Sequence, residues 1–335
     1  MPPLLLSLVL RTRTALLSLV VALVSAGGAV ERAQTATPPV TRGVVLINTN
    51  LALESSSAAG TGIVLTKNGE VLTNNHVIRG ATTINVVVPA TKRTYPATVL
   101  GYDIVHDIAL LKLQGAANLG TATFGNSANV KIGQVTRAVG NANGGGRLVI
   151  TTGHVTARSR TISVQDDSGD VARLTGLIET SARLVPGDSG GPLLNASGRV
   201  IGIDAAGSPT FGFATSAPGY AIPINRALAI AKQVEAQRSS ATVHVGPTAF
   251  IGLSLAQNAN GVAVGAVVPN SPAAGAGLQP GDLITALDGG SVTSFADLRT
   301  RLFLHHPGDA VTLAYVDATG AQASATIVLG TGPPQ

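Results

Sequence analysis

The 335-residue sequence contains no cysteine, 3% aromatic residues and only 12% charged residues. The lack of thiols excludes disulfides, thiolate metal sites and cysteine catalysis, so core packing must hold the folded chain together. The formal charge of +5 comes from scattered Lys and Arg residues without a dense run. Nucleic-acid binding requires clustered cations and often stacking aromatic rings. We therefore predict no nucleic-acid partner.

Glycine and proline are abundant instead, with 40 and 18 residues, and 45% of the chain is hydrophobic. This composition favours short strands joined by turns, and the length suggests two domains. Short β-rich runs recur between Val44 and Ile222, separated by turn signals such as Asn68-Gly69. The pattern predicts a mainly β fold, a sandwich or a barrel, that ends near Pro223.

The N-terminus has the features of an export signal. Arg11 and Arg13 precede the apolar stretch 15–24, which leads into small residues at Gly27 and Ala29. Residues 1–30 are therefore a signal peptide or an N-terminal membrane anchor. Cleavage is favoured, although residues 14–30 are nearly long enough to stay in a bilayer. We predict an exported protein that is secreted, periplasmic or associated with the cell envelope, with a linker at residues 31–42.

A helical pattern follows the β region. Leu228, Ala231 and Val234 recur at helical spacing, and Asn225 can cap the start of the helix. Residues 225–245 are therefore predicted to be a helical connector. A second unit is predicted over residues 246–331, ending in a strand pair near residues 311–316 and 325–328.

A serine lies in a glycine-rich turn, Pro186-Gly-Asp-Ser-Gly-Gly-Pro192. A serine hydroxyl is a poor nucleophile unless a base activates it and a third group orients the base. His76 is the candidate base and Asp107 the candidate orienting carboxylate, with Asp103 as its rival. Backbone N–H groups of Gly187 and Ser189 would bind the developing oxyanion.

None of these motifs is sufficient alone, because Asp167-Ser-Gly169 contains the same tripeptide, lacks the second Gly and the Pro, and is best interpreted as a polar loop tip. Three motifs together in one chain carry far more weight. The other five histidines show no metal-ligand spacing with carboxylates. We therefore predict no metal and no cofactor.

In the order His, Asp, Ser, the three segments resemble the HtrA (Deg) serine proteases, which have a trypsin-like fold. The resembling motifs are Thr73-Asn-Asn-His-Val77, Asp103 to Lys112, and Gly187-Asp-Ser-Gly-Gly-Pro-Leu193. The resemblance implies a double six-stranded β-barrel over residues 43–224. It also implies His76 as general base and acid, Asp107 as orienter, Ser189 as nucleophile, and Gly187 with Ser189 as oxyanion donors.

The second unit resembles a PDZ domain, a small α+β fold, most specifically in the segment 271–284. PDZ domains bind a peptide C-terminus as an added strand. The resemblance implies a carboxylate-binding loop formed by Phe250, Ile251, Gly252 and Leu253. A helix starting at Ser294 presents Phe295, Leu298 and Leu302, which serve equally as groove wall or core, with core favoured for Leu302.

The resemblance therefore implies a serine endopeptidase that cleaves unfolded or damaged proteins through an acyl-enzyme. The alternative is a non-catalytic, peptide-binding chaperone or scaffold. The family commonly has other residues where this chain has Arg183, Val185 and Asp188, so the preferred P1 residue stays open. The short segment between Thr41 and Gly60 argues against a large cage and leaves a homotrimer open.

Overall fold

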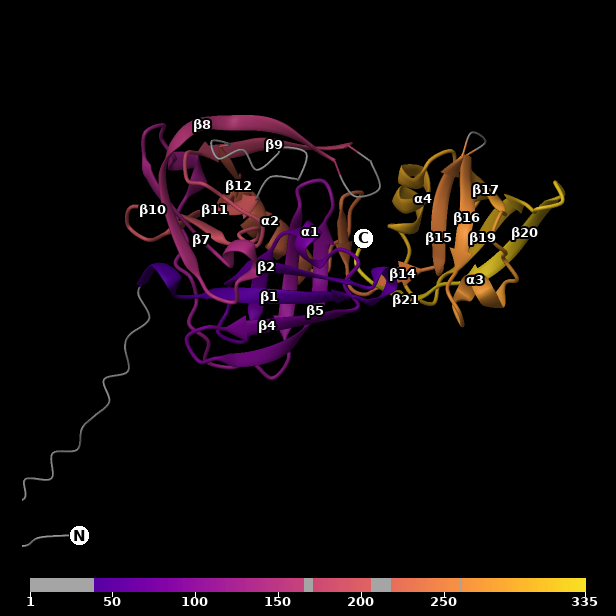
Figure 1. The fold of residues 1–335 in the computed structure, drawn as a ribbon, viewed down its shortest axis with the longest axis horizontal. Coiled ribbons are helices and arrows are strands. Elements are labelled where there is room, and N and C mark those ends of the chain that lie inside the picture. Colours follow the sequence, from indigo (N-terminus) through magenta and orange to yellow (C-terminus); the bar gives the residue numbers. More distant parts are fainter. Residues whose placement is uncertain (1–38, 166–170, 206–217, 259–260) are drawn as a thin grey trace, which may run out of the picture. The chain divides into compact units, whose positions relative to one another are not determined.

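The computed structural model describes residues 39–165, 171–205, 218–258 and 261–335 (Figure 1). The predicted export segment, residues 1–30, and the loop around Ser168 lie outside these ranges. Most of the predicted linker, residues 31–42, also lies outside them. Among the residues that are described, no helix is long and apolar enough to cross a membrane.

Within the described ranges, six antiparallel strands close the first barrel, because β5 pairs with both β4 and β6. The strands are β1 (Val44–Leu51), β2 (Ser56–Val64), β3 (Glu70–Thr73), β4 (Thr83–Val88), β5 (Arg93–Asp103) and β6 (Ile108–Leu113). Short helical turns accompany them: η1 (Pro39–Thr41), η2 (Ala52–Glu54) and α1 (Asn75–Ile78).

The continuous apolar runs of this barrel reflect two cores, since alternate residues of a strand point to opposite faces. In β6, Leu111 and Leu113 pack in the interior of the first barrel. Ile108 and Leu110 of the same strand instead pack in a cluster that also contains Val139 of the second barrel. Each fully buried aliphatic side chain of this kind stabilises the fold by about 1.5–3 kcal/mol.

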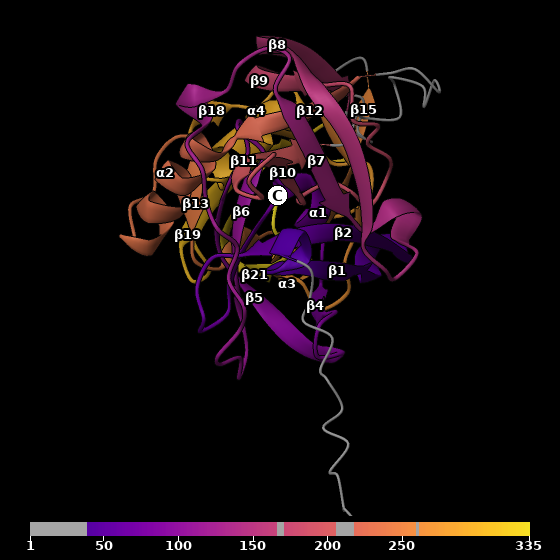
Figure 2. The ribbon, with the colours of Figure 1, turned by 90° about the vertical axis from the view of Figure 1, so that its left-hand side faces the viewer.

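The second barrel is also closed by six antiparallel strands among the described residues (Figure 2). They are β7 (Val135–Gly140), β8 (Val149–Gln165), β9 (Val171–Thr180), β10 (Pro192–Asn195), β11 (Val200–Ala205) and β12 (Gly219–Pro223). Two 3₁₀ turns, η3 (Ser127–Asn129) and η4 (Ala142–Gly144), precede β7 and β8. The predicted double six-stranded barrel is therefore confirmed.

Helix α2 (Ile224–Glu235) follows the second barrel, and its predicted cap is wrong. The N-cap residue is Pro223, with no side-chain cap, and Asn225 lies inside the first turn. The Asn225 side chain bonds outward instead: its Oδ1 accepts from the Ser127 N–H at 3.1 Å and its Nδ2 donates to Asn126 at 2.7 Å. Asn225 Oδ1, which could have accepted a hydrogen bond from the first turn of α2, is therefore bonded to Ser127 instead.

After α2 the chain returns to the first barrel as a strand, β13 (Val243–Val245), which pairs with β5. Val243 and Val245 are buried in the cluster shared by the two barrels. The segment predicted as a helical connector therefore contains a helix and, after a loop, a three-residue strand that joins the first sheet.

The C-terminal region forms an α+β unit of its own, as the resemblance to a PDZ domain implied. Its sheet has the strand order β15-β16-β17-β19-β20, so β15 is an edge strand. The elements are β14 (Thr248–Phe250), β15 (Leu253–Asn258), β16 (Gly261–Val267), α3 (Pro272–Gly275), β17 (Leu283–Leu287), β18 (Gly290–Ser291), α4 (Phe295–Leu302), β19 (Ala310–Val316), β20 (Gln322–Val328) and β21 (Gly330–Gly332). The predicted C-terminal strand pair corresponds to β19 and β20, which are paired along their whole length.

Candidate active site

His76 lies in α1, the short turn that follows β3, and it contacts Asp107 twice. Its ring Nδ1 is 2.8 Å from Asp107 Oδ2, and its backbone N–H donates to Asp107 Oδ1 at 2.9 Å. An ionised carboxylate can only accept, so we assign the ring hydrogen to Nδ1. This tautomer leaves the lone pair on Nε2, which can therefore accept a proton.

The surroundings of His76 favour its charged form overall. Burial lowers its pKa, but the charge of Asp107 and the hydrogen bond from the ring raise it, against a small opposing effect of Arg79. The pKa of His76 consequently lies above its usual value. The side chain still keeps 41% of its surface exposed, so the ring is accessible. A ring that holds a proton well and can be reached from solvent suits a general base.

Asp107 occupies the turn between β5 and β6 in the left-handed backbone conformation, with φ of 55°. Its carbonyl oxygen accepts a hydrogen bond from the buried Asn74 side chain at 2.8 Å. The rival carboxylate, Asp103, lies at the other end of the same turn and contacts His106 Nδ1 at 2.8 Å. The structure thus brings Asp107, and not Asp103, to the His76 ring.

Ser189 lies in the turn before β10, where two backbone N–H groups are left unbonded. Among the described residues, neither Gly187 nor Ser189 donates a backbone hydrogen bond, whereas the N–H groups of Asp188, Gly190 and Gly191 each bond to a backbone carbonyl. The N–H groups of Gly187 and Ser189 lie on either side of Asp188 in the chain. An oxyanion hole requires such a pair of unbonded donors. The turn is buried, with Ser189 only 6% exposed.

Threonines of the first barrel hold this turn against the second. Thr61 Oγ1 donates to the Gly187 carbonyl at 2.7 Å, and the Thr61 N–H donates to the Ser189 carbonyl at 2.8 Å. Thr73 Oγ1 in turn donates to the Thr61 carbonyl at 2.8 Å. Gly190, with φ of 85°, fits beside them because an added Cβ would collide with Thr61 O and Thr73 Oγ1. The serine turn is therefore fixed to the barrel that carries His76 and Asp107.

Two buried carboxyl groups lie behind the serine. Burial raises the pKa of Asp188 to about 6, although a hydrogen bond from the Val185 N–H opposes the shift. Burial and then the charge of Asp188 raise the pKa of Asp204 well above its usual value. Asp204 is fully buried and neither of its carboxylate oxygens has a hydrogen-bond partner among the described residues. The pair is therefore best accommodated with at least one proton.

A groove of about 470 Å³ lies in the C-terminal unit. It is lined by residues 249–255, by one side of α4 and by residues 333–335. The N–H groups of Ile251 and Gly252 donate no hydrogen bond to the described residues, so they are available to a ligand. Leu302, for which a core position was favoured, is only partly buried and lines this groove together with Phe295 and Leu298.

Sequence reasoning missed several groups that shape the site. In the glycine-rich loop after β7, Asn141 is fully buried, and its N–H donates to Thr61 Oγ1 at 2.9 Å. The next residues reach the serine turn, since the Asn143 N–H donates to the Pro186 carbonyl. The signal that could have pointed to these contacts is a polar residue next to apolar ones in two strands, Thr61 before Ile63 and Val64 in β2 and Thr73 after Val71 and Leu72 at the end of β3. Among the described residues, no three His, Asp or Glu side chains are grouped to hold a metal.

Two protein families match the chain. Residues 60–203 match the trypsin-like peptidase domain, and residues 249–318 match the PDZ domain. A serine protease Do-like HtrA of Lactococcus lactis subsp. cremoris is 33% identical over 291 residues, which cover 82% of this chain and 71% of the relative. The periplasmic pH-dependent serine endoprotease DegQ of Escherichia coli is 35% identical over 267 residues, or 76% of this chain and 55% of the relative.

Solved structures agree with these matches. The structure of the HtrA-type protease AlgW with a decapeptide aligns with a TM-score of 0.50 at 25% identity, covering 89% of this chain and 98% of that chain. Several curated relatives are longer than the region they share with this protein. The chain spans 63% of the length of the serine protease PepD of Mycobacterium tuberculosis and 55% of that of DegQ.

Proposed function

Because the chain belongs to the HtrA family of serine proteases, we propose that it is a serine endopeptidase with His76, Asp107 and Ser189 as its catalytic triad. The observation that supports this best is the His76 ring, oriented through Nδ1 by Asp107. The two unbonded N–H groups at the Ser189 turn provide the second requirement of the chemistry.

The proposed chemical steps are those of acyl transfer through a serine nucleophile. The Ser189 hydroxyl attacks the carbonyl carbon of the scissile peptide bond, and its proton passes to His76 Nε2. The N–H groups of Gly187 and Ser189 bind the oxyanion, while Asp107 stabilises the imidazolium. His76 then returns the proton to the departing amine, and an acyl-enzyme remains. Water hydrolyses the acyl-enzyme by the same kind of attack, with His76 again acting first as base and then as acid.

The C-terminal groove is proposed to bind peptide C-termini. An extended peptide can pair with the free edge of β15, and the N–H groups of Ile251 and Gly252 lie where its carboxylate would be bound. Phe250 and Leu253 complete the loop, and α4 forms the facing wall. The decapeptide and tripeptide in the structures of AlgW are consistent with peptide ligands for this kind of protein.

The substrates we propose are unfolded or damaged proteins in the cell envelope. The export features of residues 1–30 and the periplasmic location in the name of DegQ support this location. Retention by an anchor at residues 14–30 and assembly into a homotrimer remain hypotheses of the same proposal. N-terminal sequencing of the exported protein recovered from membrane and soluble fractions separates an anchored from a cleaved form.

Labelling by a fluorophosphonate tests the enzyme against the alternative of a non-catalytic chaperone. We expect the full chain, but not Ser189→Ala, to be labelled and to degrade fluorescent casein. A chain that prevents aggregation of a denatured client and yet shows no labelling, with or without a hydrophobic C-terminal peptide, would instead establish the chaperone alternative. Mass spectrometry of the labelled peptide identifies the serine and excludes Ser168.

A further inference from the structure

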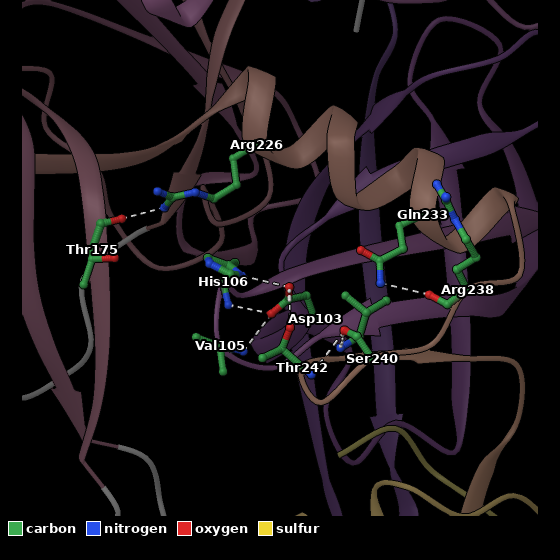
Figure 3. Close-up of polar contacts among 10 residues, drawn as sticks. Asp103, Val105, His106, Thr175, Arg226, Gln233, Arg238, Ser240 and Thr242 are labelled. Atoms are coloured by element: carbon green, nitrogen blue, oxygen red, sulfur yellow. Dashed lines mark hydrogen bonds and ion pairs between the residues drawn. The ribbon is translucent and has the colours of Figure 1, made fainter.

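Another buried carboxylate, Asp103, lies at the end of β5, four residues before Asp107. The Asp103 side chain is only 2% exposed and its two oxygens are surrounded by donors (Figure 3). Oδ1 accepts from the backbone N–H groups of Val105 at 2.9 Å and of His106 at 2.8 Å. Oδ2 accepts from the His106 ring at 2.8 Å and from the Thr242 hydroxyl at 3.3 Å. These four contacts join the Asp103 side chain to both the turn and the segment at Thr242.

The turn that carries Asp107 is held on both sides. Asp107 itself has φ of 55°, a left-handed conformation that is uncommon for non-glycine residues but that aspartate adopts more readily than most. After Asp107 the chain enters β6, and the Asn74 side chain donates a hydrogen bond to the Asp107 carbonyl oxygen. Before Asp107 the chain is fixed at residues 105 and 106 by the Asp103 carboxylate alone among the described side chains. The two aspartates therefore stand at opposite ends of one constrained turn.

The same carboxylate contacts the segment that leads to the C-terminal unit. The Ile104 N–H donates to the Thr242 carbonyl at 3.1 Å, and Val243 pairs with Asp103 at the start of β13. The Thr242 hydroxyl donates to the carboxylate and not to the His106 ring. The Thr242 hydroxyl is therefore not arranged as the nucleophile of a second catalytic pair.

We propose that Asp103 and His106 are positioning residues for catalysis, which set the orientation of Asp107 and through it that of His76. The inference rests on the proposed triad. Asp103 touches neither His76 nor Ser189 in the contacts described, so its effect must pass through the turn. A change in these Asp103 contacts would loosen Asp107 without removing any catalytic group.

The proton spectrum of the resting protein tests this without depending on turnover. The His76 Nδ1–H, hydrogen-bonded to Asp107, should give a far-downfield resonance that is assigned by its loss in Asp107→Asn. Asp103→Asn retains an oxygen for the two backbone N–H groups but places an amide against the His106 ring N–H. We expect the His76 resonance to shift or broaden in this variant. Asp317→Asn, which alters a similar aspartate-capped turn in the C-terminal unit, should leave it unchanged.

Activity provides the second measurement. We expect Asp103→Asn to lower kcat for fluorescent casein by about 10- to 100-fold with KM changed less than about twofold, because a small misplacement of a catalytic group acts on the transition state. His106→Asn, which keeps an amide N–H facing the carboxylate, should retain more activity than His106→Ala. Higher activity in His106→Ala than in His106→Asn would overturn the proposal.

Three further outcomes also bear on the positioning role of Asp103. A folded Asp103→Asn variant whose His76 resonance and kcat match the wild type overturns the proposal. If that variant does not fold by circular dichroism, His106→Ala is measured in its place and is read by the same criteria. Absence of labelling of the wild type by a fluorophosphonate would count against the proposed function, while the resonance would still report on the turn.

Discussion

Replacing Thr61 by valine should damage both the stability and the chemistry of the protein, because one hydroxyl joins three segments. Thr61 is fully buried, its Oγ1 donates to the Gly187 carbonyl and it accepts from the Asn141 N–H. Valine has nearly the same shape but offers neither contact, so two buried polar groups lose their partner. Each such group costs about 1–3 kcal/mol, and the free energy of unfolding should fall by about 2–6 kcal/mol.

Activity should fall as well, because the Gly187 peptide loses the bond that fixes its orientation. Removal of one oxyanion donor typically lowers kcat by about 10²–10³-fold, and we expect a loss of up to about 100-fold here. Thr61→Ser is the matched control, since it keeps the hydroxyl and removes one methyl group worth about 0.8 kcal/mol. Urea unfolding and casein turnover measure both effects. A valine variant within about 0.5 kcal/mol of wild type, or a serine variant equally damaged, would refute this reasoning.

Two further predictions concern the carboxyl behind the serine and the peptide groove. Folded Asp188, with a pKa of about 6, binds a proton that the unfolded chain has released, so the free energy of unfolding falls as pH rises from about 4 to 6. Asp188→Asn should remove this decline and gain on the order of 2–3 kcal/mol in urea titrations at pH 7.5 but not at pH 4; equal gains at both would contradict the assignment. Gly252, with φ of 89°, has no room for a Cβ beside the Ser271 side chain. Gly252→Ala should weaken binding of a hydrophobic C-terminal peptide about tenfold or more in fluorescence anisotropy, with fluorophosphonate labelling unchanged; unchanged affinity would remove the loop from the groove.

The barrels could be predicted from the sequence because strand patterning is local. Runs such as Ile108 to Leu113 indicated buried strands directly, and the order of the His, Asp and Ser motifs supported the resemblance to a trypsin-like fold. The start of α2 was predicted less well. Asn225 has the right residue type for a cap, but its side chain bonds to residues 126 and 127, a contact between positions almost a hundred residues apart.

The supports of the site were harder to predict for the same reason. Thr61 contacts Gly187 across 126 positions of sequence, and no local pattern records such a pairing. The choice between Asp103 and Asp107 had an analogous difficulty, since both are followed by apolar residues and lie four positions apart. Their different partners, His106 and His76, emerge only when the turn between β5 and β6 is folded.

The return of the chain to the first barrel as β13 limits where the protein can be truncated or its C-terminal module exchanged. A truncated protein designed from the match to the peptidase family alone would stop near residue 203, and one designed from the helix would stop near residue 238. Either would strip a strand from β5 and expose the backbone groups next to Asp103 to solvent. Exchange of the C-terminal module between related proteins, by engineers or by recombination, should therefore succeed only when the junction falls after Val245.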